Sequence, residues 1–148
     1  MKYLLDTNIL IIYLRDQQTK TAIENNFHPF DLPNIPLVSV VSIGELESFA
    51  LRNKWGKKRL DKLDFFLKQT VIVDINFTDI IKKYGEIDAF SQGKLTNNPL
   101  GMSARNMGKN DLWIAATACV SDAILLTADR DFEHLDNHYL NLERIELA

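Results

Sequence analysis

Short apolar runs alternate with longer helix-like segments along most of this chain, and this alternation limits the possible fold more than any other feature. The runs are rich in leucine, isoleucine and valine and stop at turn or cap residues, as buried strands do. They comprise residues 3–5, 37–41, 70–75 and 123–127, with a further candidate edge strand at 142–147. The segments between them predict helices at residues 9–14, 19–26, 42–51, 52–68, 78–90 and 109–118. Strands that alternate with helices form βαβ units, so we expect an α/β fold whose parallel sheet is covered by helices on both faces.

The length and charge of the chain limit the number of domains it can form and the kinds of partner it can bind. At 148 residues it is long enough to bury a substantial core. It contains no repeat, low-complexity tract or linker, so we expect one domain over residues 1–148. The net charge of −3 provides no global attraction for nucleic acid, so such a partner would need a local basic patch.

Cysteine usage and the N-terminal sequence indicate the compartment. The single cysteine, Cys119, excludes an intrachain disulfide and is expected to be a small buried side chain in a reducing environment. Asp6 interrupts the first apolar run, which argues against a signal peptide, and no apolar run is long enough to span a bilayer. We therefore expect a cytoplasmic protein with no membrane partner.

Four carboxylates occupy the positions where parallel sheets place their chemistry. Asp6 and Asp129 come directly after the first and fourth predicted strands, and Glu45 and Asp111 stand at the starts of helices. Because the carboxyl ends of parallel strands share one edge, these side chains are expected to meet in one cleft.

Each carboxylate also has a purely structural explanation. Asp6 can cap the helix that follows it, and Asp111 or its neighbour Asn110 can cap the helix at 109–118. Glu45, three residues after Ser42, completes the pattern of a capping box. Each of these explanations accounts for one residue. Together they do not predict that all four carboxylates lie at the same end of the sheet.

A cluster of carboxylates favours a hard divalent cation. Ionised neighbours repel one another and raise each other's pKa unless a cation shares the site. Ligands that are all oxygen select Mg²⁺ or Mn²⁺, and a partly filled Mg²⁺ shell suits phosphate chemistry. Zinc is disfavoured because the chain has one cysteine and its histidines, His28, His134 and His138, lie in connecting segments, where the four-residue spacing of the last two is only a weak ligand pattern. Neither a P-loop nor a dinucleotide-binding glycine pattern is present.

Two segments are candidates for contact with a substrate. In residues 52–68, a stripe of Leu60, Leu63, Phe66 and Leu67 is expected to be buried, and positive charge gathers around Trp55. This segment is either a solvated helix face anchored by the tryptophan or a phosphate-contacting rim where the tryptophan stacks on a base.

The second candidate is the aperiodic stretch from Gly93 to Gly108, which contains Ser103 and Arg105 and leads to Lys109. Long loops of this kind are usually functional or disordered. We interpret it as a substrate-side loop, with a plain exposed insertion as the alternative.

Motifs in four places give the chain a family resemblance. In order they are Leu4-Leu5-Asp6-Thr7-Asn8, Ser42 with Glu45-Leu46, Asp111-Leu112-Trp113-Ile114-Ala115-Ala116-Thr117-Ala118, and Leu126-Thr127-Ala128-Asp129-Arg130-Asp131-Phe132. With these motifs the chain resembles the PIN-domain ribonucleases, in particular the VapC-type toxins of bacterial type II toxin–antitoxin pairs. The resemblance covers nearly the whole chain, and the long 93–108 segment departs from the tighter connection of shorter members.

The resemblance implies a PIN-like fold of three α/β/α layers around a central, mostly parallel sheet. It implies an endoribonuclease that uses Mg²⁺ or Mn²⁺ and an activated water, leaving a 3′-hydroxyl and a 5′-phosphate. It also implies a homodimer, and an antitoxin protein whose tail occupies the acidic cleft.

The same resemblance assigns roles to individual residues. The catalytic and metal-binding quartet would be Asp6, Glu45, Asp111 and Asp129, with Asp111 or Asp129 helping to take the proton of the water. The supporting residues would be Asn8, Thr127 and Asp131, and Asp131 makes the fourth carboxylate position ambiguous. The candidate RNA contacts are Arg105 and Lys109.

Three other functions remain as alternatives. One is a housekeeping PIN nuclease in RNA processing. Another is a phosphatase of the haloacid-dehalogenase kind with Asp6 as nucleophile, although members of that family have a second aspartate at the position where this chain has Asn8. The third is a catalytically silent module whose acidic cleft binds a basic partner segment.

Overall fold

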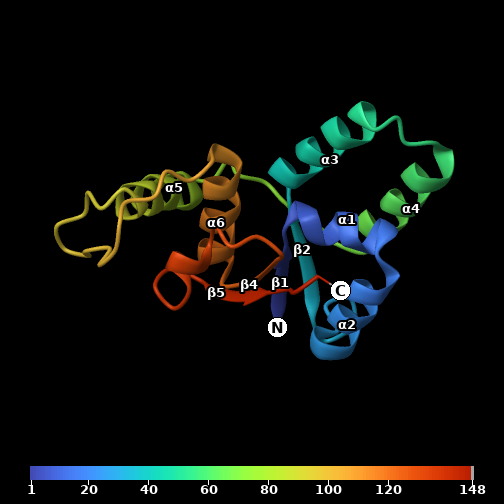
Figure 1. Ribbon diagram of the computed structural model, residues 1–148, viewed down its shortest axis with the longest axis horizontal. Helices are drawn as coiled ribbons and strands as arrows, with labels where there is room; N and C mark the ends of the chain where they lie inside the picture. Colours follow the sequence, from blue (N-terminus) through green and yellow to red (C-terminus); the bar gives the residue numbers. More distant parts are fainter. Residues whose placement is uncertain (148) are drawn as a thin grey trace.

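A five-stranded sheet forms the centre of the computed structural model, which describes residues 1–147 (Figure 1). Its strands are β1 (Lys2–Leu5), β2 (Ile35–Ser39), β3 (Val71–Val73), β4 (Ile124–Thr127) and β5 (Asn141–Arg144). They lie in the order β3-β2-β1-β4-β5, and every neighbouring pair is parallel. The first strand of the chain, β1, is therefore the central strand, and its carboxyl end lies in the middle of one edge of the sheet.

Helices cover both faces of this sheet. They are α1 (Thr7–Arg15), α2 (Gln17–Phe27), α3 (Val40–Arg52), α4 (Lys57–Leu67), α5 (Thr78–Ser91) and α6 (Lys109–Ser121), with a short 3-10 helix η1 (Glu133–Leu135). Helices α5 and α6 lie on one side of the sheet and α1, α2 and α4 on the other, as Figure 1 shows. The predicted three-layer α/β/α fold with a parallel sheet is confirmed.

Successive strand residues supply the two separate halves of the core. Leu4 and Leu125 point toward α5 and α6, whereas Leu5 and Leu126, one residue later in each strand, pack against the helices of the other face. All four are fully buried, because side chains alternate across a pleated strand and here both faces are covered. Burial of each such side chain contributes about 1.5–3 kcal/mol.

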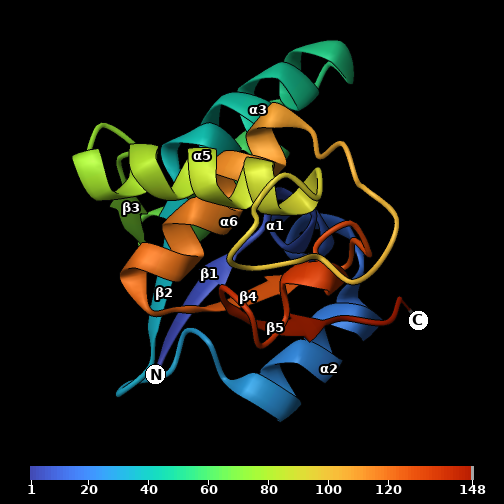
Figure 2. The ribbon, with the colours of Figure 1, turned by 90° about the vertical axis from the view of Figure 1, so that its left-hand side faces the viewer.

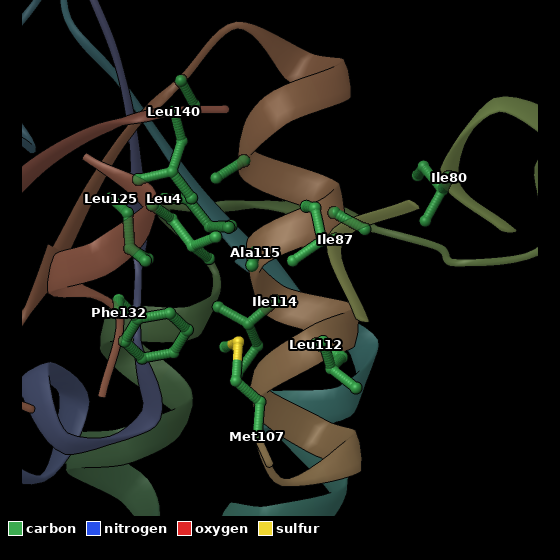
Figure 3. Packing of buried hydrophobic residues seen from close by; sticks show 14 of the residues in the cluster. Leu4, Ile80, Ile87, Met107, Leu112, Ile114, Ala115, Leu125, Phe132 and Leu140 are labelled. Atoms are coloured by element: carbon green, nitrogen blue, oxygen red, sulfur yellow. The ribbon is translucent and has the colours of Figure 1, made fainter. Parts of the chain in front are cut away.

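Helix α6 approaches the sheet closely through small and β-branched residues. Ile114, Ala115 and Ala118 are at most 1% exposed, and Ile114 and Ala115 lie beside Leu4 and Leu125 of the sheet in Figure 3. Cys119, expected in the same buried face, is only half-buried, since it lies at the border of the α5-facing side of the helix.

The long loop at 93–108 is tied to the core at several points. Figure 2 shows it arching from the end of α5 to the start of α6. Its Leu100 and Met107 are buried in the same cluster as α5 and α6, and the Arg105 backbone N–H donates to the Ser91 carbonyl over 2.7 Å. The interpretation as a plain exposed insertion is therefore wrong for these anchor residues, although the loop's role toward a substrate stays a prediction.

The segment 52–68 differs from the expectation in two ways. It breaks at residues 53–56, so that α4 begins only after Gly56. Leu60 is 42% exposed, whereas Leu63 and Phe66 of the expected stripe are buried. Trp55 is buried, with the Arg59 guanidinium over its ring. The hypothesis that Trp55 stacks on a base is therefore wrong, and the tryptophan anchors the α3–α4 turn.

Candidate functional site

All four carboxylates predicted for the site line one pocket of about 250 Å³. Asp6 follows β1, Asp129 follows β4, and Glu45 and Asp111 project from α3 and α6. The elements come from both ends of the chain, and the parallel sheet brings their functional ends to one edge. The predicted convergence of these side chains is present in the structure.

Asp6 is the most deeply buried member of this acidic cleft. It is 4% exposed and acts as the N-cap of α1, since its Oδ1 accepts the Thr7 N–H over 2.8 Å. Its Oδ2 accepts the Thr127 hydroxyl over 2.7 Å and the Asn8 amide over 3.2 Å. The capping interpretation and the site interpretation of Asp6 are thus compatible, because the two oxygens have different neighbours.

Asn8 and Thr127 join the ends of β1 and β4. The side-chain Oδ1 of Asn8 accepts the Ala128 N–H over 3.1 Å, and the Thr127 hydroxyl oxygen accepts the Asp129 N–H over 3.0 Å. Both residues also contact Asp6, so these polar side chains fix the relative positions of Asp6 and Asp129.

Glu45 does not form the expected capping box. Helix α3 begins at Val40, and Ser39 caps it by accepting the Val41 N–H, so Glu45 lies in the helix interior. Its Oε1 accepts the Thr7 hydroxyl over 2.7 Å, and the Ser42 hydroxyl lies 2.9 Å from that of Thr7.

Asp111 is not a cap either, and neither is Asn110. Helix α6 starts at Lys109 after Gly108, whose backbone opens the helix without a side-chain hydrogen bond. Asp111 therefore has a half-buried carboxylate that points toward the cleft, with no hydrogen bond to it from residues 1–147.

A fifth carboxylate, Asp131, lies beside this group. Single oxygen atoms of Asp111, Asp129 and Asp131 lie within 4.8 Å of one another. Asp131 is exposed, and its backbone N–H donates to Asp129 Oδ1 over 2.9 Å. The ambiguity at the fourth carboxylate position therefore remains, since both aspartates of the β4 turn approach Asp111.

The electrostatics of the cleft fit a divalent cation. Burial raises the pKa of Asp6 to about 6, although hydrogen bonds from Thr127 and Thr7 oppose the shift. Burial and then the charges of the neighbouring carboxylates raise the pKa of Asp111 to about 7. Carboxyl groups that resist ionisation together are stabilised by a shared cation, and a donor set of oxygens alone matches Mg²⁺ or Mn²⁺.

Thr7 and Phe49 were not anticipated from the sequence as residues of the cleft, whereas Arg52 belongs to the 52–68 segment that was interpreted either as a solvated helix face or as a phosphate-contacting rim. Thr7 holds Glu45, and Phe49 and Arg52 of α3 also line the pocket. The Arg52 and Arg15 guanidinium carbons lie 5.5 and 5.7 Å from the centre of the Phe49 ring. The spacing of Glu45, Phe49 and Arg52 at i, i+4 and i+7 is the sequence signal that could have identified them, because it places all three on one helix face.

Arg105 and Lys109 lie outside the lining of the acidic pocket. Both are exposed, Arg105 on the long loop and Lys109 at the first position of α6. Their contact with RNA stays a prediction. Within residues 1–147, no helix is both long and apolar enough to cross a membrane.

Several solved structures share the fold of this chain. VapBC2 from Rickettsia felis, bound to a DNA fragment from the promoter of its own genes, has a chain that is 26% identical with a TM-score of 0.76, covering 99% of this chain and 100% of that one. VapBC-1 of nontypeable Haemophilus influenzae matches at 21% identity and TM-score 0.71, over 97% and 98% of the two chains. VapBC-5 of Mycobacterium tuberculosis matches at 23% identity and TM-score 0.63, over 99% and 98%. No curated protein sequence matches this chain.

The family model of the PIN domain matches residues 3–138, nearly the full length. This match excludes the phosphatase of the haloacid-dehalogenase kind, and the VapBC structures confirm the resemblance to VapC-type toxins. The chain therefore belongs to the PIN domain family, a family of nucleases, and has the fold found in VapBC toxin–antitoxin structures.

Proposed function

We propose that this protein is an endoribonuclease dependent on Mg²⁺ or Mn²⁺, and that it acts as a single-domain cytoplasmic toxin of a toxin–antitoxin pair. The observation that carries the proposal is the convergence of four carboxylates in one pocket at the carboxyl edge of the sheet. The toxin role is supported by the VapBC structures that share this fold.

The residues that would hold the metal are Asp6, Glu45, Asp111 and Asp129, with Asp131 as a further candidate beside Asp129. The bound cation would supply a polarised water and would neutralise charge on the attacked phosphate. Asp6 suits a fixed ligand because two hydrogen-bond donors orient its Oδ2. Glu45 is oriented in the same way by the Thr7 hydroxyl.

Asp111 is the better of the two candidates for taking the proton of the attacking water. One oxygen of Asp129 already accepts the Asp131 N–H, whereas the carboxylate of Asp111 accepts no hydrogen bond from residues 1–147. A group that accepts a proton must be within direct reach of the water, and a half-buried, unengaged carboxylate at the cleft satisfies this need.

Arg52 would contact the phosphate of the bound RNA. Its exposed guanidinium is at the wall of the same pocket, braced by the Phe49 ring and by the Ser48 hydroxyl at 3.3 Å. Arg105 and Lys109 are proposed as more distant RNA contacts, because each is an exposed cation where the long loop meets α6.

The nuclease proposal is tested with purified protein and total cellular RNA in Mg²⁺, Mn²⁺ or EDTA. Discrete fragments that appear only with metal and carry a 5′-phosphate are the expected result. An intact RNA pool in every condition would contradict the nuclease and favour a cleft that only binds a basic partner segment, such as an antitoxin tail.

Thr127 is proposed as a positioning residue for Asp6 and Asp129. Thr127→Val keeps the side-chain shape but removes the hydrogen bonds that join Thr127 to Asp6 and Asp129, together with a longer one of 3.4 Å from the Asn8 amide. We expect the Mn²⁺ concentration for half-maximal cleavage to rise about tenfold, as for other residues that orient metal ligands.

The matched control is Thr117→Val, which removes an equally buried hydroxyl that bonds only within α6. Metal titrations of both variants, with thermal melts alongside, separate positioning from stability. Equal metal dependence in the two variants would overturn the role of Thr127.

An apolar strip near β3 supports self-association. Phe77, the N-cap residue of α5, and Ile81 in the first turn of that helix are 56% and 49% exposed. Val71 and Ile72 on the edge strand β3 are also exposed. We propose that this strip is the contact surface of a homodimer, since contiguous exposed apolar groups mark interfaces.

Ile81→Lys is expected to convert this dimer to a monomer, because it places a charge at the centre of the strip. Light scattering should then give the chain mass of 17.0 kDa in place of twice that value. Leu51→Lys, which changes an exposed leucine on α3, is the control and should leave the dimer intact. A wild-type protein that is already monomeric would refute the dimer.

A further inference from the structure

A second and larger cavity adjoins the acidic cleft. It has a volume of about 590 Å³, and Glu45 and Arg52 line both cavities. Gly44, Asn110 and Trp113 contribute further walls. Because the two cavities share side chains, a strand whose phosphate lies in the acidic cleft would bring its next nucleotide to this second cavity.

The lining of the second cavity combines flat apolar surface with a polar rim. Trp113 is half-buried and braced by Tyr84, with ring centroids 4.3 Å apart, so the indole is held in place before any ligand arrives. Asn110 and Ser48 are exposed polar residues at the rim. An aromatic platform with an amide and a hydroxyl beside it matches the apolar face and polar edge of a nucleobase.

Gly44 leaves the helix side of this cavity open. It lies inside α3, where glycine weakens a helix relative to alanine, and its backbone does not need positive φ. A Cβ built at Gly44 would meet nothing within 4 Å. The packing of this chain therefore does not require a glycine here, whereas an open floor is required if a ligand enters the cavity.

We propose that this cavity binds one unpaired base of the RNA, adjacent to the phosphodiester group in the acidic cleft. The inference rests on the proposed nuclease function and adds a specificity site to it. Trp113 provides the stacking surface, Asn110 and Ser48 face the base edge, and Arg52 contacts the phosphate that joins the two sites. The expected consequence is a base preference at one position next to the cleavage site.

A size series at Gly44 tests the proposal. Gly44→Leu adds a large side chain at a position where a Cβ meets no atom within 4 Å, and Gly44→Ala adds only a methyl group. Both changes favour the helix, so neither should lower the melting temperature. We expect loss of cleavage to grow with side-chain size, reaching about tenfold or more for leucine, the scale of a lost base–aromatic stack.

An abasic substrate makes the test specific to the base. The substrate is an oligoribonucleotide that spans a mapped cleavage site, compared with copies that lack a single base at each position in turn. At one adjacent position the missing base should slow the wild type, and on that substrate wild type and Gly44→Leu should cleave equally. If Gly44→Leu slows the intact and all abasic substrates by the same factor, the base pocket is refuted.

Binding measurements separate this inference from the nuclease proposal. Anisotropy of labelled single-stranded oligoribonucleotides, including the four homopolymers, is recorded in EDTA for wild type and Gly44→Leu. Base-dependent binding that Gly44→Leu removes, without any cleavage by the wild type, would support the pocket and reject the nuclease. Cleavage that is indifferent to both Gly44 and the missing base would support the nuclease and reject the pocket. Loss of a dimer in Gly44→Leu, with no base dependence, would assign the cavity to a second copy of the chain and overturn the proposal.

Discussion

Asp111→Asn is expected to lower metal-dependent RNA cleavage at least about a hundredfold, the lower range for loss of a positioned proton acceptor. Asparagine keeps the shape of the side chain but removes the charge and the ability to accept the proton of water. Since Asp111 makes no hydrogen bond within residues 1–147, the change leaves the local structure unchanged. Initial rates on a defined oligoribonucleotide over a Mn²⁺ titration measure the effect.

Asp122→Asn is the matched control for this variant. Asp122 lies at the other end of α6 with φ of 52°, a left-handed conformation that asparagine also adopts readily. Its cleavage rate should equal that of the wild type. A wild-type cleavage rate in Asp111→Asn would show that Asp111 has no catalytic role. Full activity in EDTA would show that cleavage does not need a metal.

The same substitution is expected to stabilise the metal-free protein. Burial and the neighbouring carboxylates raise the pKa of Asp111 from its ordinary value of 3.8 to about 7, so the folded state binds more protons than the unfolded state between these values. The free energy of unfolding therefore falls as pH rises from about 4 through 7, and the repulsion is fully felt above pH 7. Asp111 is half-exposed, so after allowance for solvent screening we expect Asp111→Asn to gain on the order of 1–2 kcal/mol at pH 8.

Thermal melts at pH 5 and pH 8, with and without Mn²⁺, measure this effect. In EDTA at pH 8 the variant should melt a few degrees above the wild type, and the gap should narrow at pH 5. Saturating Mn²⁺ should raise the wild-type melting temperature more than that of the variant, because ligand binding to the folded state adds stability. An equal metal shift in both proteins would show that Asp111 does not hold the cation.

The pKa of Asp6, which is buried more deeply than Asp111, is also raised. Its pKa of about 6 has the same sign of shift, but three hydrogen bonds to its carboxylate offset the penalty of burial. The site thus combines one carboxylate that the fold supports with another, Asp111, that the fold leaves unsatisfied. Clustered charge of this kind is typical of sites arranged for a ligand.

The sequence by itself determined that Asp6 and Asp129 lie at the same edge of the sheet. Apolar runs that stop at Asp6 and just before Asp129 predicted buried parallel strands, and parallel connection places their carboxyl ends at one edge. The convergence of Asp6 and Asp129 follows from these local patterns, because strand composition and chain direction are both readable in the sequence. The family motifs named Asn8 and Thr127 only as supporting residues, and the hydrogen bonds by which they join the ends of β1 and β4 are visible only in the tertiary structure.

The exact starts of helices were decided only by the tertiary structure. Ser39 and Ser42 are both acceptable caps, and α3 uses Ser39, which releases Glu45 from the capping box and allows it to meet Thr7. Likewise α6 opens at Gly108 and leaves Asp111 free. A shift of a few residues costs little in local energy, so contacts with other elements select the start.

The burial of Trp55 and the cavity beside Gly44 also depended on tertiary structure. Trp55 lies in a cationic segment whose pattern fits either a surface or a core position, and packing against Phe49 decides the outcome. The cavity at Gly44 involves α3, α6 and the segment after β3, which no local pattern connects. Sequence patterns report which face of an element is apolar, but the space left between distant elements exists only once they have packed.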